Sequence, residues 1–178
     1  MHVQLKQGEG QQGIDLMPFT IVVSNNEVTH CADYKFTNLP PLNPGKRVLV
    51  RVISRYLKTG DYTLEGFEDA ICCERKQLSD LFQCCGKERD RFEAEVQRMN
   101  EMQHAFIVIE ADTREMWRPS EFFSDWRSGV YPRSVEGTFV SWSLRYPRVH
   151  WWMCGSRRAA EIRTFGALEM FWRQSHDS

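Results

Sequence analysis

Residues 59–82 read TGDYTLEGFEDAICCERKQLSDLF, and this stretch decides the architecture expected for the rest of the chain. It combines a glycine turn that leads into Asp61, an apolar strand that ends in Glu74, and a basic residue, Lys76, two positions later. Side chains alternate between the two faces of a strand, so Glu74 and Lys76 are predicted to share one face. The sequence therefore predicts a carboxylate beside an ammonium group, with a second carboxylate arriving from the turn.

Two converging carboxylates make a site rich in oxygen, which favours Mg²⁺ or Mn²⁺ over zinc. A metal held by Asp61 and Glu74 could activate water and stabilise charge on a phosphate. The alternative interpretation is that these acids and Lys76 are ordinary charges at strand ends, engaged in surface ion pairs. The spacing of the residues alone does not separate the two interpretations.

The order Gly60-Asp61, then Glu74-Arg75-Lys76, then Asp80 resembles the signature of the XPF-type nuclease domain, a branch of the restriction-endonuclease-like superfamily. The resemblance is strongest to the compact, stand-alone versions found in phages and prophages, and it extends from Phe19 to Trp172. Later segments that agree with it are Arg91–Met99, Phe106–Glu110 and Arg145–Trp152. The resemblance implies an α/β restriction-endonuclease-like fold, in which a mixed central β-sheet is flanked by helices.

The same resemblance implies a metal-dependent DNA endonuclease, selective for branched, flap or junction DNA in phage or prophage DNA metabolism. The catalytic residues it implies are Asp61, Glu74, Lys76, Arg75 and Asp80. The metal ligands it implies are Asp61, Glu74 and the backbone carbonyl of Arg75, with Glu27 as a further candidate. In this reading Lys76 orients the attacking water or stabilises the phosphate, and an ion pair with Asp80 holds Arg75.

One segment departs from the family pattern. After the first strand the family normally has Asp, a small residue, Arg and Glu, whereas this chain has Ser24-Asn25-Asn26-Glu27. The change removes one carboxylate and one arginine from the edge of the expected site. It favours a rival reading, a catalytically weakened DNA-binding protein of the same fold that acts with a partner. A restriction-like enzyme that reads a sequence is a third reading.

The length and the net charge of the chain limit these interpretations. The 178 residues, of 21.0 kDa, are expected to form one nuclease domain over residues 18–174 after a polar leader over residues 1–17. The net charge of −1 means that any DNA contact must come from a local basic surface. The candidates for that surface are Arg145, Arg148, Arg157 and Arg158. A solvated helix face is the alternative for the last two.

Several classes of protein are disfavoured. No apolar run approaches the roughly 20 residues of a membrane span, and the polar start is unlike a signal peptide, so we expect no membrane contact and a cytoplasmic location, in the host cell if the gene belongs to a phage. Six cysteines include the adjacent pairs Cys72-Cys73 and Cys84-Cys85. These pairs lack zinc-ribbon spacing, so buried thiols are favoured over structural zinc.

Hydrophobic periodicity places the remaining elements. Strands are predicted at residues 18–23, 46–56, 62–67, 70–74, 105–109 and 149–153. Helices are predicted from residue 77 and over residues 89–102, 134–146 and 157–173. The segment 115–132 is expected to lack regular structure.

Two groups of large side chains are open to more than one reading. In the segment 115–132, Trp117 and Trp126 stand beside Arg118 and Arg127, so they could stack on unpaired bases or pack on the domain. The large apolar residues of the last helix exceed what docking requires, and relatives of the family commonly pair through equivalent helices. A homodimer through the C-terminal helices is therefore expected. Its candidate residues are Ile162, Phe165, Leu168, Phe171 and Trp172.

Overall fold

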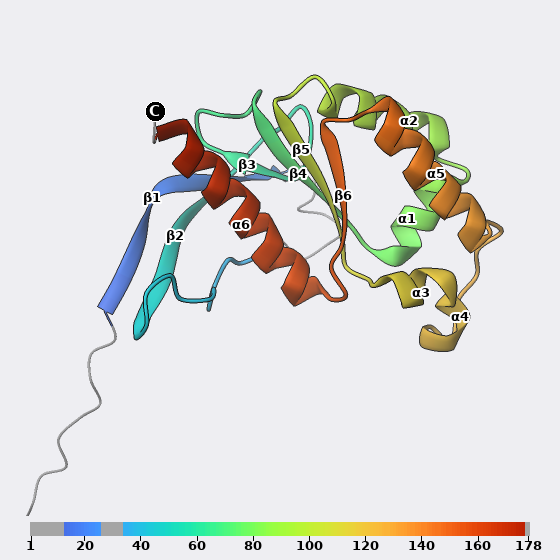
Figure 1. Cartoon of the computed structure of the whole chain (residues 1–178), viewed down its shortest axis with the longest axis horizontal. Coiled ribbons are helices and arrows are strands. Elements are labelled where there is room, and N and C mark those ends of the chain that lie inside the picture. Colours follow the sequence, from blue (N-terminus) through green and yellow to red (C-terminus); the bar gives the residue numbers. More distant parts are fainter. Residues whose placement is uncertain (1–12, 26–33, 177–178) are drawn as a thin grey trace, which may run out of the picture.

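The computed structural model describes residues 13–25 and 34–176, and it contains a six-stranded sheet with helices on both faces (Figure 1). The strands are β1 (Gly13–Ser24), β2 (Lys46–Arg55), β3 (Tyr62–Leu64), β4 (Ile71–Lys76), β5 (His104–Ile109) and β6 (Val149–Met153). The helices are α1 (Leu78–Cys85), α2 (Arg89–Met99), α3 (Thr113–Trp117), α4 (Pro119–Phe122), α5 (Pro132–Arg145) and α6 (Arg157–His176).

The sheet is mixed, with the strand order β2-β1-β3-β4-β5-β6. The short strand β3 is antiparallel to both of its neighbours, β1 and β4, whereas β4, β5 and β6 are parallel to one another. The carboxyl ends of these three parallel strands therefore meet at one end of the sheet, near Lys76, Ile109 and Met153. This architecture confirms the predicted α/β fold.

Each face of the sheet has its own core. On one face, α1, α2 and α5 enclose buried residues that include Phe82, Phe92 and Trp142. The apolar residues of α1 and α2 are buried there at helical spacing, in agreement with the hydrophobic periodicity that predicted these two helices. On the other face, α6 crosses the strands diagonally (Figure 1) and packs on residues that include Phe19 and Tyr62.

Helix α6 also holds the segment that follows the undescribed residues 26–33. The backbone N–H of Phe36 donates a hydrogen bond to Glu161 Oε1 at 2.6 Å, and Tyr34 stacks on Tyr62 with ring centroids 4.9 Å apart. Phe165, Leu168 and Phe171 of α6 are buried within the chain itself. The expectation that these three side chains form a dimer face is therefore wrong, because their apolar surface is already used in the monomer core.

Several boundaries differ from those predicted. Strand β1 begins at Gly13, so the expected leader overlaps the sheet over residues 13–17, and its earlier part lies outside the described residues. The region 113–122 forms two short helices, α3 and α4, where irregular structure was expected. Helix α5 begins at Pro132, because proline suits the first helical turn. Among the described helices, none has a stretch long and apolar enough to cross a bilayer.

Candidate active site

Asp61 is positioned by a tight backbone approach between the turn and β4. Gly60 adopts a φ of +78°, and a Cβ built on it would lie 2.7 Å from Cys72 Cβ, so only glycine fits. The Asp61 N–H donates to the Cys73 carbonyl at 2.9 Å, and the Arg75 N–H donates to Asp61 Oδ2 at 2.7 Å. The predicted role of Gly60 in aiming the acid is confirmed.

Glu74 and Lys76 lie on the same face of β4, as the alternation of side chains predicts. Lys76 Nζ is 2.5 Å from Glu74 Oε1 and lies 4.8 Å from the centre of the Phe92 ring. Burial lowers the pKa of Lys76, but the neighbouring Glu74 carboxylate outweighs it, and the pKa ends above its usual value. Lys76 is therefore a fixed positive charge and not a proton acceptor at neutral pH.

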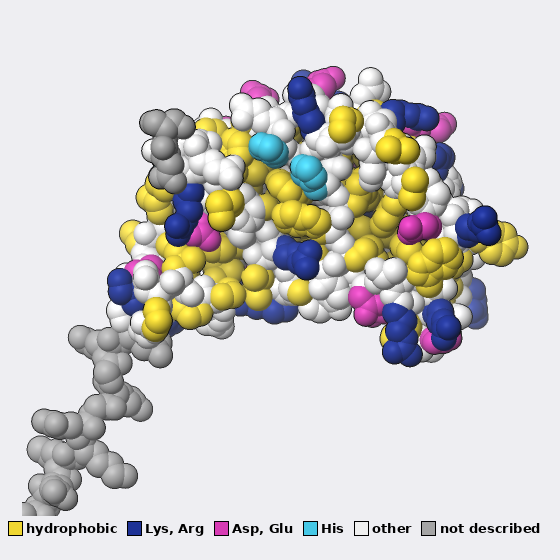
Figure 2. Space-filling view, in the orientation of Figure 1, with side chains coloured by type: hydrophobic (Ala, Val, Ile, Leu, Met, Phe, Trp, Pro, Cys, Tyr) yellow, Lys and Arg dark blue, Asp and Glu magenta, His cyan; other side chains and the backbone are white. Residues whose placement is uncertain are grey.

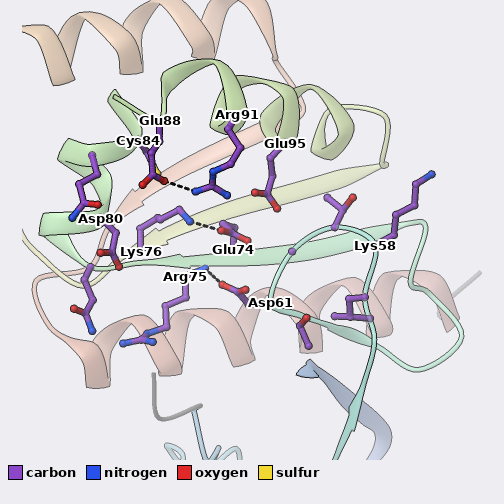
Figure 3. Close-up of a pocket in the computed structure, with 16 residues that line it drawn as sticks. Lys58, Asp61, Glu74, Arg75, Lys76, Asp80, Cys84, Glu88, Arg91 and Glu95 are labelled. Carbon is purple, nitrogen blue, oxygen red and sulfur yellow. Dashed lines mark hydrogen bonds and ion pairs between the residues drawn. The ribbon is translucent and has the colours of Figure 1, made fainter. Parts of the chain in front are cut away.

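A pocket of about 430 Å³ opens beside this pair (Figure 3). Asp61, Glu74 and Lys76 line it from the sheet, and α1 and α2 supply the opposite wall. The lining residues with side chains able to carry charge are Lys58, Asp61, Glu74, Arg75, Lys76, Asp80, Cys84, Glu88, Arg91 and Glu95. The structure thus brings all five residues of the expected catalytic set to the edge of one cavity.

Glu95 is a site residue that the sequence analysis missed. It lies on α2 and, in Figure 3, its carboxylate points toward Glu74. Burial, followed by repulsion from Glu74, raises its pKa. Glu95 follows the buried Phe92 by three positions, so it lies on the border of the apolar stripe of α2. That border position could have indicated, from the sequence, that Glu95 faces the sheet side of α2 and not open solvent.

Arg75 points to the opposite face of β4, where it binds Glu110. Its Nε and Nη2 atoms lie 2.6 and 2.9 Å from the two carboxylate oxygens of Glu110, and Arg157 Nη1 lies 3.5 Å from the same carboxylate. Tyr34 packs against both arginines. The centre of its ring lies 5.6 Å from Arg75 Cζ and 5.2 Å from Arg157 Cζ. This cluster closes the sheet end behind the pocket.

Asp80 does not hold Arg75. Among the described residues, the ion pairs of Arg75 include no contact with Asp80, whose Oδ1 instead accepts a hydrogen bond from Ser79 Oγ at 3.4 Å. The expected Arg75–Asp80 pair is therefore wrong. The cause is the strand alternation itself, which turns Arg75 away from α1 while Asp80 stays at the pocket wall.

Ser24 lies at the end of β1, where the family pattern has aspartate. Its N–H donates to the backbone carbonyl of Asp61 at 2.8 Å, and its side chain is buried and lines the pocket. The replacement therefore falls inside the site. Asn26 and Glu27, two further members of that segment, lie outside the described residues.

The four arginines proposed for DNA contact are divided between two ends of the sheet. Arg145 and Arg148 lie just before β6, at the end opposite Lys76, and Arg145 is paired with Glu93. Arg157 and Arg158 begin α6, at the end where the pocket lies. Arg158 contacts Glu161 at 2.6 Å and the Asn38 carbonyl, so part of its role is structural.

The donor set at the pocket suits a hard cation. Asp61 and Glu74 contribute carboxylate oxygens, and the Arg75 carbonyl points to the Asp61 side of β4, because residues 73 and 75 direct their backbone groups the same way. Over residues 13–25 and 34–176, no three His, Cys, Asp or Glu side chains gather closely enough to enclose a metal by themselves. Asp61, Glu74 and the Arg75 carbonyl are the groups that would hold a metal ion here.

A mixed sheet that brings two acids and a lysine together at the end of one strand defines the class, an α/β domain with the restriction-endonuclease-like fold. More particularly, the family model of the ERCC4 domain matches residues 32–161. The chain therefore belongs to the ERCC4 domain family, the family of the XPF-type nuclease domain.

Two solved structures share the fold. XPF from Aeropyrum pernix in complex with DNA is 20% identical, with a TM-score of 0.55 over 90% of this chain and 68% of that one. XPF from Aeropyrum pernix without DNA is also 20% identical, with a TM-score of 0.53 over 88% of this chain and 61% of that one. No curated protein sequence matches the chain.

Proposed function

We propose that this protein is an endonuclease that hydrolyses DNA phosphodiester bonds with the help of Mg²⁺ or Mn²⁺. The observation that carries the proposal is the convergence of Asp61, Glu74 and Lys76 on one pocket, in a chain that belongs to the ERCC4 domain family. The structure of an archaeal XPF with DNA supports DNA as the substrate.

The residues divide the work as follows. Asp61, Glu74 and the Arg75 carbonyl would hold the metal ion, and Asp61 is kept in place by the Arg75 N–H. When bound, the ion would activate the attacking water and neutralise charge that develops on the phosphate. Lys76 adds a fixed positive charge beside the phosphate, where it stabilises the transition state. Asp80 lines the pocket wall and completes the proposed catalytic set.

The substrate we propose is a branched, flap or junction DNA. The resemblance to compact phage and prophage versions supports a role in phage or prophage DNA metabolism, in the cytoplasm of the host cell. Arg157 and Arg158, at the pocket end of the sheet, are the better placed of the four arginines to contact the DNA backbone near the scissile bond. Arg145 and Arg148 lie at the other end and would contact only a more distant part of the duplex.

The test is cleavage of a labelled panel of linear duplex, single strand, flap, fork and four-way junction in Mg²⁺, Mn²⁺ or chelator. Wild-type protein is expected to cut a branched member only when metal is present. Alanine at Asp61, Glu74 or Lys76 is expected to slow the reaction at least about 100-fold. Near-normal cutting by all three variants would sink the assignment of the site.

A second function is favoured by Ser24, which occupies the pocket where a family member has a carboxylate. In that case the protein binds branched DNA, cuts it weakly and acts with a partner. The same panel separates the two functions. Binding without cutting in every metal, together with cutting after Ser24→Asp, would establish the weakened protein.

We also propose that the protein pairs with a second copy beside α6. A groove of about 540 Å³ runs between α6 and the sheet, and Figure 2 shows hydrophobic side chains gathered there below two histidines. Phe106 and Trp152 line it from β5 and β6, and Met170 of α6 is 55% exposed beside them. Analytical ultracentrifugation should show a dimer that Met170→Glu weakens. A monomer at all concentrations would refute pairing.

A further inference from the structure

A second groove adjoins the catalytic pocket, and nothing in the proposed mechanism uses it. Its volume is about 680 Å³, and it lies between the start of α1 and the segment that connects α4 to α5. Gln77 and Gln83 line both this groove and the catalytic pocket. The two cavities are therefore neighbours along α1, so a strand that followed this helix out of the catalytic pocket would reach the second groove.

The groove is walled by aromatic rings that the fold leaves open to solvent. Phe122 and Phe123 are each 41% exposed, although large apolar side chains are costly to hold in water. Trp126 supports Phe123 from the core side. Its ring lies edge-on against the buried Phe82, with centroids 4.8 Å apart, and 5.9 Å from Phe123. Phe123 thus rests on the core through Trp126, while Phe122 lies beside it at the groove.

Basic side chains accompany these rings. Arg127 lines the groove, and the guanidinium of Arg114 lies 5.1 Å from the centre of the Phe122 ring. Figure 2 shows Lys and Arg side chains gathered over α3 and α4, with acidic ones among them. Asp125 and Glu110 also line the groove, but Arg75 neutralises Glu110. The charge is therefore mixed, which favours a ligand held mainly by stacking.

We propose that this groove, formed by Phe122, Phe123, Trp126 and Arg127, binds unpaired nucleotides of the DNA strand that leaves the catalytic pocket. Unpaired bases expose π-faces that stack on aromatic rings whatever their sequence, and arginine contacts the phosphates between them. Paired bases keep these faces inside the duplex. The groove thus selects DNA with a single-stranded segment next to the cut. This inference rests on the proposed nuclease function, because it assigns the substrate of the same site.

The first test measures binding alone, with chelator present so that no cleavage occurs. A fluorescently labelled oligothymidylate is titrated with the full chain and followed by anisotropy. The double change Phe122→Leu and Phe123→Leu keeps apolar bulk but removes both rings, so it should weaken binding about tenfold to a hundredfold. Phe122→Tyr with Phe123→Tyr keeps the rings and should bind as wild type. Leu144→Ala, on the exposed side of α5, is the matched surface control.

The second test measures cleavage of a flap and of a flush duplex with the same flanking sequence. The double leucine variant should lose flap cleavage while any duplex cleavage is unchanged. Oligothymidylate binding equal to wild type would overturn the groove assignment, and so would an equal loss on the two DNAs. If wild-type protein cuts neither DNA in any metal but binds oligothymidylate in a ring-dependent way, the nuclease proposal fails and the groove stands. Thermal unfolding of each variant checks that the fold is intact.

Discussion

Two charged pairs lie back to back on β4, and their surroundings differ. On the pocket side Lys76 contacts Glu74, and Glu95 adds a second carboxylate from α2. On the opposite side Arg75 binds both oxygens of Glu110. The side chains are similarly buried, at 13% and 6% exposure for the first pair and 4% and 8% for the second. Burial alone therefore does not distinguish a reactive pair from a structural one.

The balance of charge and geometry does distinguish them. Glu110 accepts a bidentate contact from Arg75, the geometry that best compensates the loss of water, and Arg157 lies beside the same carboxylate as a second cation. On the pocket side, burial and the neighbouring Glu74 carboxylate raise the pKa of Glu95, so a bound cation would relieve the repulsion between these two carboxylates. The comparison leads us to predict that one face of β4 serves stability and that the other serves the proposed reaction.

The largest effect is expected at the structural pair. Glu110→Ala leaves the Arg75 guanidinium buried without its carboxylate, so the free energy of unfolding should fall by about 3–5 kcal/mol. Urea unfolding followed by circular dichroism measures this change. A variant as stable as wild type would show that the two faces of β4 do not differ in the way described.

The next effect concerns the pocket face. Glu74→Gln keeps the shape of the side chain but removes a carboxylate and its repulsion with Glu95. We expect cleavage to slow by at least about 100-fold, while the free energy of unfolding should fall by less than it does for Glu110→Ala, because Glu95 leaves a second carboxylate near Lys76. Metal-dependent cleavage and urea unfolding of the same preparation measure both. A loss of stability equal to that of Glu110→Ala would contradict the comparison.

The turn that aims Asp61 offers a smaller and sharper test. Gly60 and Gly66 both have positive φ, at +78° and +86°, but only at Gly60 would a Cβ meet a neighbour, Cys72. Gly66→Ala should cost about 1–2 kcal/mol in unfolding free energy from backbone strain alone. Gly60→Ala should cost more and should also slow cleavage, because the clash displaces Asp61. Equal effects of the two changes on cleavage would show that the close approach does not position the acid.

The smallest effect is expected at Ser24. Ser24→Asp places a further carboxylate at the pocket, so the metal concentration for half-maximal cleavage should fall roughly tenfold, equivalent to about 1.4 kcal/mol. Ser24→Asn is the matched control, since it adds similar bulk without charge. Titration of Mg²⁺ in the cleavage assay measures the shift. An equal response to both changes would attribute the effect to shape.

The sequence predicted those parts of the site that depend on neighbours along the chain. The period of a strand was enough to put Glu74 and Lys76 on one face, and the Gly60-Asp61 pair was enough to predict the turn. The apolar stripes of α1 and α2 likewise predicted their buried faces. Roles in catalysis and metal binding are still predictions.

The sequence did not reveal contacts made across the sheet. Glu110 is the partner of Arg75 because β4 and β5 pair in parallel with Arg75 opposite Val108, which brings a residue 35 positions away beside the arginine. Asp80 is nearer to Arg75 in the sequence, and only the register of β4 and β5 shows that it is not the partner of Arg75. The use of Phe165 in the monomer core was hidden for the same reason, since its partner Phe19 comes from the first strand.

The bond between Phe36 and Glu161 spans 125 residues and ties an early segment to the last described helix. On the ribosome, β1 and the segment after it leave the exit tunnel long before α6 has been made. The apolar residues of these segments on the α6 side of the sheet stay uncovered until α6 is made, since long-range contacts form late. The nascent chain therefore completes the cluster of Tyr34, Arg75 and Arg157 only after α6 emerges. The order of synthesis therefore delays the formation of the cluster that closes the sheet end behind the pocket.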